Sequence, residues 1–221
     1  MGLNVSKGDM YPWVTHTWNA IKGKCPHDCT YCYMKRWGNL SETHFDRKEL
    51  KTDLGEGNFI FVGSSCDMFA FPGIKDSWIV EALEYCRGFN NSYLFQSKNP
   101  ASMKTYLSRL PSKTVLCTTL ETNRWIPSIM GKSPTPSDRA QWMGELEIFD
   151  RYVTIEPIID FDLKPFVELI KQCEPKQVNI GADSGKNGLP EPSVMKVSAL
   201  IEELSKFTTI ARKNNLGRLL A

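Results

Sequence analysis

Apolar and polar positions along the chain alternate between short strand-like runs and longer helical patterns. Runs rich in β-branched and aromatic residues predict six strands, at residues 13–20, 58–63, 92–97, 113–119, 152–158 and 177–182. Apolar residues at helical spacing follow the last five of these runs, and they predict helices over residues 76–88, 99–111, 135–151, 162–175 and 191–207. Gly88 and Pro111 mark helix ends.

This alternation predicts parallel βαβ units in a single domain that covers residues 1–221. A complete eight-unit barrel needs about 250 residues, or roughly 31 per unit. Six units need on the order of 190 residues by the same measure, which fits a chain of 221 residues. We therefore expect a partial (β/α)6 TIM-type barrel, with a doubly wound open sheet as the main alternative.

Both architectures collect ligands at the C-terminal ends of their parallel strands. The segments at these ends are far more polar than the strands that precede them: "THTWN", "GSSCD", "QSKN", "TTLET", "IEPIID" and "IGADSG". The stretch "KCPHDCTYCYMKRW", residues 24–37, follows the first predicted strand. We expect it to lie at the same edge, and we call it the cluster loop.

Composition excludes few classes of function. The net charge of +2 neither requires nor forbids a polyanionic partner. No run of apolar residues is long enough to span a membrane, and the N-terminus lacks the pattern of a secretory leader. Seven cysteines, four of them scattered, do not form a disulfide framework. A reducing, cytoplasmic location without a membrane partner fits these features best.

The cluster loop carries Cys25, Cys29 and Cys32 in the spacing C-x3-C-x2-C. A structural zinc site needs four protein ligands, so His27, His16 or Cys66 would have to complete it, and none has a recognised spacing. A four-iron cluster normally takes four thiolates. Three leave one iron without a protein ligand, and an open metal position is where a substrate binds. The trio therefore favours a reactive iron–sulfur cluster, and zinc stays the alternative.

The stretch "CPHDCTYC" resembles the signature of radical S-adenosylmethionine (radical SAM) enzymes. "CTYCY" and the "TWN" before it look like the branch that contains spore photoproduct lyase and small phage-associated members. The resemblance implies that Cys25, Cys29 and Cys32 hold a [4Fe-4S] cluster whose fourth iron binds S-adenosylmethionine. Reductive cleavage would then yield a 5′-deoxyadenosyl radical that abstracts hydrogen from a substrate. Flavodoxin or ferredoxin is the expected electron donor.

The resemblance also implies residues that hold the cofactor. Tyr31 would cover one face of the cluster, and Lys98 would meet the methionyl carboxylate. The polar stretch after the second strand would meet the amino group, and the end of the fourth strand would meet the ribose. The candidates at these two positions are Ser64, Ser65 and Asp67, and then Thr119 and Glu121.

Two further candidates come from the residues themselves. Glu156 directly follows an apolar strand, and burying an unpaired carboxylate costs several kcal/mol, so we predict a catalytic or binding role. Asn179 in "VNIGAD" is a second polar residue near a strand end, and we add it to the cofactor-binding set. Cys66 is a candidate hydrogen donor or an inert thiol. Spore photoproduct lyase has its donor cysteine at the position of Ser64, so photoproduct repair itself is not implied.

For the substrate, the resemblance points to a nucleobase or nucleoside, above all a modified thymidine in DNA that is isomerised or otherwise modified. Basic and aromatic residues near the cluster loop fit a nucleic-acid partner, although these rings would equally pack the end of the barrel: Lys22, Lys24, Lys35, Arg36, Trp13, Trp18 and Trp37. A peptide or small metabolite is the alternative substrate. A zinc-stabilised binding module without catalysis is the alternative class.

Overall fold

The six predicted strands are all present, and they belong to one eight-stranded sheet. The computed structural model of the chain describes residues 3–8 and 10–221. The strands of the sheet, in their spatial order, are β1 (Asn4–Val5), β2 (His16–Trp18), β5 (Phe59–Val62), β6 (Ser92–Gln96), β7 (Thr114–Thr119), β8 (Asp150–Ile155), β9 (Gln177–Ile180) and β10 (Thr209–Arg212). A separate antiparallel pair is formed by β3 (Ile21–Lys22) and β4 (His44–Phe45).

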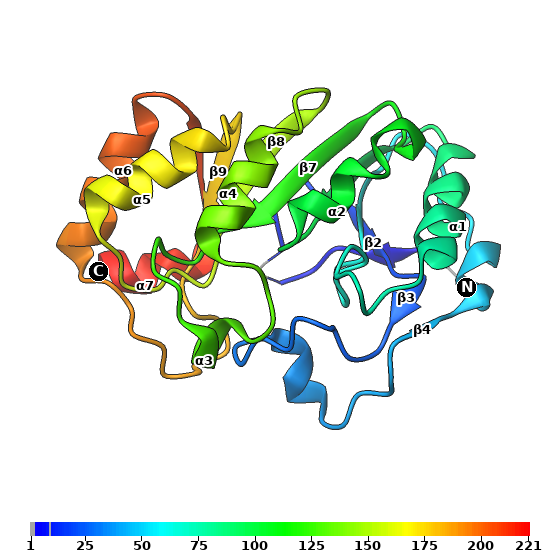
Figure 1. Cartoon of the computed structure of the whole chain (residues 1–221), viewed down its shortest axis with the longest axis horizontal. Coiled ribbons are helices and arrows are strands. Elements are labelled where there is room, and N and C mark those ends of the chain that lie inside the picture. Colours follow the sequence, from blue (N-terminus) through cyan, green and yellow to red (C-terminus); the bar gives the residue numbers. More distant parts are fainter. Residues whose placement is uncertain (1–2, 9) are drawn as a thin grey trace.

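The order of the strands decides between the two expected architectures. Within the eight-stranded sheet, every neighbouring pair from β2 to β10 is parallel, and only β1 runs antiparallel, on β2. A doubly wound sheet reverses its direction of growth at a switch point. Here the order follows the sequence without a reversal, so the predicted partial barrel is confirmed. Figure 1 shows the strands fanning from β2 to β9.

The strand β10, a seventh parallel strand, was not predicted from the sequence. Only Ile210 and Ala211 are apolar in its four residues, and both stay half-buried at the edge of the sheet. Such a short segment lacks the continuous apolar run that marks the inner strands. The unit β9–α6–β10 therefore extends the barrel beyond the six predicted strands.

Helices connect the strands and cover one face of the sheet. They are α1 (Asp76–Arg87), α2 (Pro100–Lys104), α3 (Pro127–Met130), α4 (Pro136–Gly144), α5 (Leu163–Gln172), α6 (Val194–Ser205) and α7 (Gly217–Leu220). Short 3-10 turns lie at Tyr33–Trp37, Arg47–Lys51, Leu107–Arg109 and Asn214–Leu216. Thr135 and Ser193 cap α4 and α6 by accepting a hydrogen bond from a backbone N–H of the first turn. In the described part of the chain, no helix is long and apolar enough to cross a membrane.

Two predicted helices were too long. The helix expected over 99–111 is divided into α2 and the turn Leu107–Arg109. The helix expected over 135–151 ends at Gly144, and Asp150 already begins β8. At Gly144 a Cβ atom would lie 2.4 Å from the carbonyl oxygen of Gln172, so the end of α4 packs closely on the end of α5. The polar start of β8 pairs with Val115 of β7, which extends the strand beyond its apolar core.

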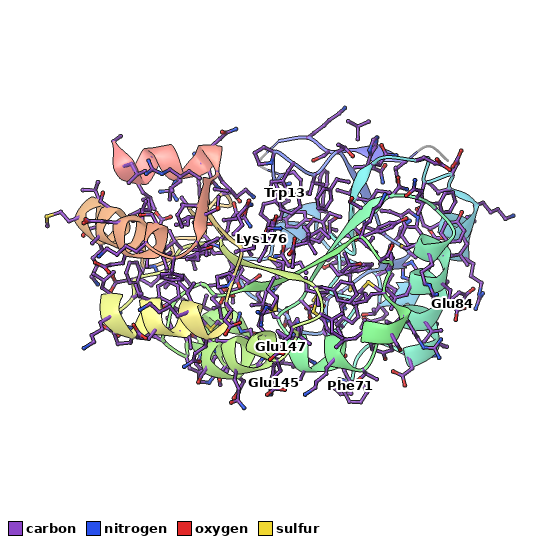
Figure 2. The ribbon with its side chains drawn as sticks, turned by 90° about the horizontal axis from the view of Figure 1, so that it is seen from above. Trp13, Phe71, Glu84, Glu145, Glu147 and Lys176 are labelled. Carbon is purple, nitrogen blue, oxygen red and sulfur yellow. The ribbon has the colours of Figure 1, made fainter. Side chains whose placement is uncertain are left out.

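The main core lies between the sheet and its helices. Alternate strand residues such as Ile60, Phe95 and Val153 point to the helical side and are fully buried. The concave side is different, because only its N-terminal half is apolar, where Phe61 and Leu94 pack against Tyr11 and further residues of the N-terminal segment. Figure 2 views the molecule from above and shows α1, α2, α4 and α5 along one side of the curved sheet and Trp13 on the other.

Candidate functional site

The C-terminal half of the concave face is a buried polar surface. The register of the sheet aligns Thr119 of β7 with Thr154 of β8 and Asn179 of β9, so the three side chains share one face. All three are buried, and the amide nitrogen of Gln96 donates to Thr119 Oγ1 at 3.1 Å. The predicted residues Thr119 and Asn179 therefore lie in one row across the sheet, on either side of Thr154.

The N-terminal end of the concave face is closed by aromatic rings. The ring of Trp13 stacks on Tyr11 at 5.2 Å between centroids and packs on Phe59 at 4.7 Å and Tyr152 at 5.4 Å. We call these four residues the floor. The hydroxyl of Tyr11 donates to Gln96 Oε1 at 2.8 Å and so joins the floor to the polar surface. Access to the polar surface must then come from the opposite end.

That opposite end, which we call the mouth, consists of the segments that follow the first six parallel strands, β2 and β5 to β9: 23–43, 63–75, 97–99, 120–135, 156–162 and 181–193. The cluster loop belongs to it and lies along the same lower edge of Figure 1 as α3. Cys29 is buried, whereas Cys25 and Cys32 are half-buried. The three predicted cluster ligands are thus at the strand ends, as expected from their place after the first strand.

The segment around α3 holds the cluster loop by its backbone. The N–H of Thr30 donates to the carbonyl of Ile129 at 3.0 Å, and the N–H of Lys132 donates to the carbonyl of His27 at 2.7 Å. Gly131 allows this approach because a Cβ atom there would lie only 2.3 Å from the His27 carbonyl oxygen, and its φ is +62°. The thiol of Cys29 donates to the Met130 carbonyl at 3.4 Å. These contacts position the cluster loop.

Asp67 anchors the other side of the cluster loop. Its carboxylate lies 2.9 Å from Nε2 of the buried His27 and accepts hydrogen bonds from the Ser97 hydroxyl and from the backbone N–H groups of Lys98 and Phe69. Burial raises the pKa of Asp67, but the hydrogen bond and charge of His27 outweigh it, and the pKa is lowered. Asp67, predicted to bind the cofactor, has its oxygens engaged by the protein and positions the loop.

A buried network surrounds Tyr31. Its hydroxyl donates to Glu121 Oε1, and the ammonium of Lys98 lies 3.6 Å from the same oxygen and 4.7 Å from the centre of the Tyr31 ring. Lys98 also donates to Cys29 Sγ at 3.4 Å. Arg139 of α4 pairs with Glu121 Oε2 at 2.8 Å, and both side chains are fully buried.

The charges in this network balance the cost of burial. Burial raises the pKa of Glu121, but Arg139 and Lys98 outweigh it and lower the pKa. Burial lowers the pKa of Lys98, yet the neighbouring Cys29, Tyr31 and Glu121 hold it well above its ordinary value. Arg139 was not among the residues predicted from the sequence. Its signal was a position on the buried stripe of α4, between Pro136 and Ala140.

The segment after β5 contacts the cluster loop from the side of Cys25. Cys66 is buried, and its interaction with the thiol of Cys25 lowers the pKa of Cys25 to about 6 and raises that of Cys66. Ser64 Oγ and the N–H of Ser65 both donate to Asn19 Oδ1, at 3.2 and 2.9 Å. Within the described residues the Ser65 hydroxyl is buried without a hydrogen-bond partner. Cys66 is thus adjacent to a predicted ligand.

Glu156 is paired, as its place after an apolar strand requires. Lys213 Nζ lies 2.5 Å from Glu156 Oε2, and the amide of Asn215 donates to Oε1 at 2.9 Å. At Gly181 a Cβ atom would lie 2.7 Å from Oε1, so glycine makes room for the carboxylate. Lys213 and Asn215 follow the unpredicted strand β10, and for that reason the sequence analysis missed them.

The thiols suit a cluster better than a single metal ion. In the described part of the chain, no three His, Cys, Asp or Glu side chains converge as they would on one ion. A four-iron cluster takes each thiolate on a different iron, so its ligands do not need to converge. The ammonium of Lys98 beside Cys29 would offset the negative charge of such a group. The donor set therefore fits a [4Fe-4S] cluster with one open iron.

No family model and no curated protein matches the chain. Solved structures do match: a cysteine-to-serine variant of spore photoproduct lyase has a TM-score of 0.59 at 14% identity, over 93% of this chain and 65% of that one. The chain has the fold of spore photoproduct lyase. Another variant, with bound AdoMet and dinucleoside spore photoproduct, has a TM-score of 0.57 at 13% identity, over 93% and 66%. The chain thus spans about two thirds of the length of these lyases.

Proposed function

We propose that the chain is a radical SAM enzyme that abstracts hydrogen from a nucleobase or nucleoside. The observation that carries this proposal is the placement of Cys25, Cys29 and Cys32 at the mouth, beside a buried polar surface and next to Lys98. When bound there, the cluster would supply the electron that cleaves S-adenosylmethionine to the 5′-deoxyadenosyl radical. The shared fold supports the proposal, since a lyase of this fold binds AdoMet in its solved structure.

The residues of the mouth divide into two groups in this proposal. Lys98 would bind the methionyl carboxylate, Ser65 offers a free buried hydroxyl for the amino group, and Thr119 and Asn179 would line the nucleoside part. Glu121, Asp67 and Tyr31 already bond to protein groups, so we assign them to positioning. Glu156 stays a catalytic candidate at the other side of the mouth, where Lys213 and Asn215 already bind its two carboxylate oxygens. Cys66 stays a candidate hydrogen donor.

The surface around the mouth supports a nucleic-acid substrate. Among the described residues with large exposed apolar side chains, five are aromatic, and four of them belong to the mouth: Tyr33 (41%), Trp37 (69%), Phe71 (62%) and Trp125 (41%). The guanidinium of Arg36 lies 5.5 Å from the ring centres of both Tyr33 and Trp37. Exposed rings next to cations are the usual platform for unpaired bases.

Charge at the mouth favours the same partner. Within the described part of the chain, every mouth carboxylate except the buried Asp183 pairs with a lysine, an arginine or, for Asp67, with His27. Four cations of the mouth have no ion pair there: Arg36, Lys75, Lys132 and Lys186. The unpaired groups of the mouth are therefore mainly positive, and one of them, Arg36, lies beside two exposed rings. This positive charge matches a phosphate backbone.

Three residues predicted to contact nucleic acid do not face the mouth. Trp18 is fully buried and stacks on Tyr85, and Trp13 belongs to the floor. Lys22 is paired with Asp46 and Glu49. For Trp13 and Trp18 the packing alternative is therefore correct, and of the seven predicted contacts Arg36 and Trp37 are exposed with no carboxylate partner among the described residues.

The first experiment tests the chemistry. Protein reconstituted without oxygen should bind about four irons per chain and cleave S-adenosylmethionine on reduction. Deuterated thymidine oligonucleotides and free nucleosides, unmodified and modified, should then transfer deuterium into 5′-deoxyadenosine. Zinc in place of iron would refute the proposal. Cleavage without transfer from any of these substrates would move the substrate to a peptide or metabolite.

A second experiment tests the surface without chemistry. The Trp37→Ala variant should bind a single-stranded oligonucleotide about tenfold more weakly in fluorescence anisotropy, since one stacked base contributes about 1–3 kcal/mol. Phe207→Ala is the matched control because Phe207 is an exposed aromatic residue outside the mouth. Equal loss in both variants, or no loss in either, would contradict a role for the exposed rings.

A further inference from the structure

A continuous set of buried contacts joins α4 to the cluster loop. Arg139 contacts Glu121, Glu121 contacts Lys98, and Lys98 donates to Cys29 Sγ at 3.4 Å. We call Arg139, Glu121 and Lys98 the buried charge cluster. Arg139 also donates to the carbonyl of Thr119 at 2.7 Å, which fixes its guanidinium at the end of β7. Thus three residues, from α4 and from the segments that follow β7 and β6, form one path to a predicted ligand.

Stability alone is a weak reason for such an arrangement. A buried ion pair loses the hydration of both ions, and apolar residues of similar volume often stabilise a core as well or better. Arg139 and Glu121 are both fully buried, and the Arg139 Nε has no hydrogen-bond partner among the described residues. This incomplete satisfaction makes a purely structural role costly.

The distances show how charge is divided in the buried charge cluster. Glu121 binds Arg139 at 2.8 Å through one oxygen, while its other oxygen accepts the Tyr31 hydroxyl and lies 3.6 Å from Lys98. Two cations therefore share one carboxylate, and Arg139 has the closer contact. The charge of Lys98 is only partly neutralised by Glu121. The rest of it acts on the sulfur of Cys29.

We propose that Arg139 and Glu121 are positioning residues that set, through Lys98, how readily a cluster bound at Cys29 is reduced. This inference rests on the proposed function. The reduction potential of an iron–sulfur cluster depends on net charge and on hydrogen bonds to its sulfurs. A cation beside Cys29 favours the more negative, reduced form. Arg139 neutralises part of the negative charge of Glu121. Glu121 then offsets less of the positive charge of Lys98, and Lys98 stabilises the reduced cluster more strongly.

The two partners of one ion pair then have opposite effects. Arg139→Met leaves Glu121 to neutralise Lys98, which lowers the potential. Glu121→Gln removes the carboxylate and leaves the charge of Lys98 unopposed, which raises the potential. Lys98→Met also lowers it, and adding Arg139→Met to Lys98→Met should lower it little further. A residue that only supports the fold would not produce opposite signs.

The test is a midpoint potential from a redox titration followed by electron paramagnetic resonance, on reconstituted protein without S-adenosylmethionine. Each single variant should change the equilibrium constant for one-electron reduction by about tenfold, which is about 59 mV. Iron content and thermal unfolding are measured on the same samples. Should Arg139→Met fail to fold, Glu121→Gln and Lys98→Met still carry the predicted opposite signs.

Arg151→Met is the matched control. Arg151 also donates to a backbone carbonyl, of Gly144 at 2.7 Å, and pairs with a carboxylate, of Glu174 at 2.8 Å, but it lies away from the mouth. The Arg151→Met variant should have a lower free energy of unfolding than the wild type and the same midpoint potential. Shifts of one sign in both Glu121→Gln and Arg139→Met, or full iron with no shift, would overturn this inference alone. Wild-type protein that binds no iron would overturn the proposed function and this inference together.

Discussion

The mouth and the floor of the barrel are built by different interactions. The floor is held by ring packing, with Trp13 in contact with three other aromatic residues. The mouth is held by hydrogen bonds and ion pairs, such as His27 with Asp67 and Glu121 with Arg139. Packing has no direction, whereas a charged hydrogen bond fixes the position of a particular atom. The comparison indicates that the floor depends on the fit of its rings, whereas the mouth holds individual polar atoms in fixed positions.

The largest expected difference between the two ends concerns their thiols. Cys29 at the mouth and Cys117 above the floor are both buried. Cys29→Ala should abolish stable incorporation of iron and all cleavage of S-adenosylmethionine, because a cluster with two protein thiolates is left. Cys117→Ala should keep both. Iron analysis and 5′-deoxyadenosine formation after anaerobic reconstitution distinguish the variants, and cleavage that persists in Cys29→Ala would refute the ligand assignment.

The sequence predicts the inner strands and the cluster loop, but it does not predict the short strands at the edges of the sheet. The six strands and the polar residues that follow them are local patterns, so the positions of Thr119, Asn179 and Lys98 could be inferred before the structure. The cluster loop is local as well, since its three cysteines lie within eight residues. The edge strand β10 and the strand β1 could not be inferred, because short edge strands carry little apolar signal.

The hydrogen-bond and ion-pair partners of the predicted residues could not be inferred from the sequence, for a second reason. Asp67 meets a histidine 40 positions away, and Glu156 meets Lys213 at a separation of 57. Such pairings depend on how strands and loops are brought together, which no local pattern encodes. The sequence therefore identifies groups that face the mouth and does not tell which of them the protein has already paired.

Removal of a ring should affect stability at the floor and leave it unchanged at the mouth. Trp13→Ala should lower the free energy of unfolding by about 3 kcal/mol, because it leaves a cavity among packed rings. Trp37→Ala removes an exposed ring and should change it by no more than about 0.5 kcal/mol. Urea titration measures both variants. Equal losses would show that the exposed rings also support the fold.

Two glycines with positive φ test whether close backbone packing holds the cluster loop in place. Gly131 and Gly188 both have positive φ, of +62° and +68°. Gly188→Ala meets open space and should cost about 1–2 kcal/mol from its backbone conformation alone. Gly131→Ala adds a clash with the backbone of the cluster loop and should also lower the iron content. Iron loss that is equal in the two variants would contradict the role of Gly131 in holding the loop.

The smallest expected effect is the response of the mouth to acid. Hydrogen bonds from Arg124 lower the pKa of the exposed Asp162 to about 2, from an ordinary value of about 3.9. Because the folded pKa is lowered, the stabilisation is complete above about pH 4 and is lost as the pH falls towards 2. In the Asp162→Asn variant, the free energy of unfolding should therefore fall less steeply as the pH is lowered from about 4 to about 2. Urea titrations at several pH values measure this slope. Arg124→Met should flatten the same interval, since it removes the cation that lowers this pKa, whereas Trp13→Ala at the floor should lower stability equally at every pH. An unchanged slope in both mouth variants would show that the ion pair adds nothing to the stability of this end.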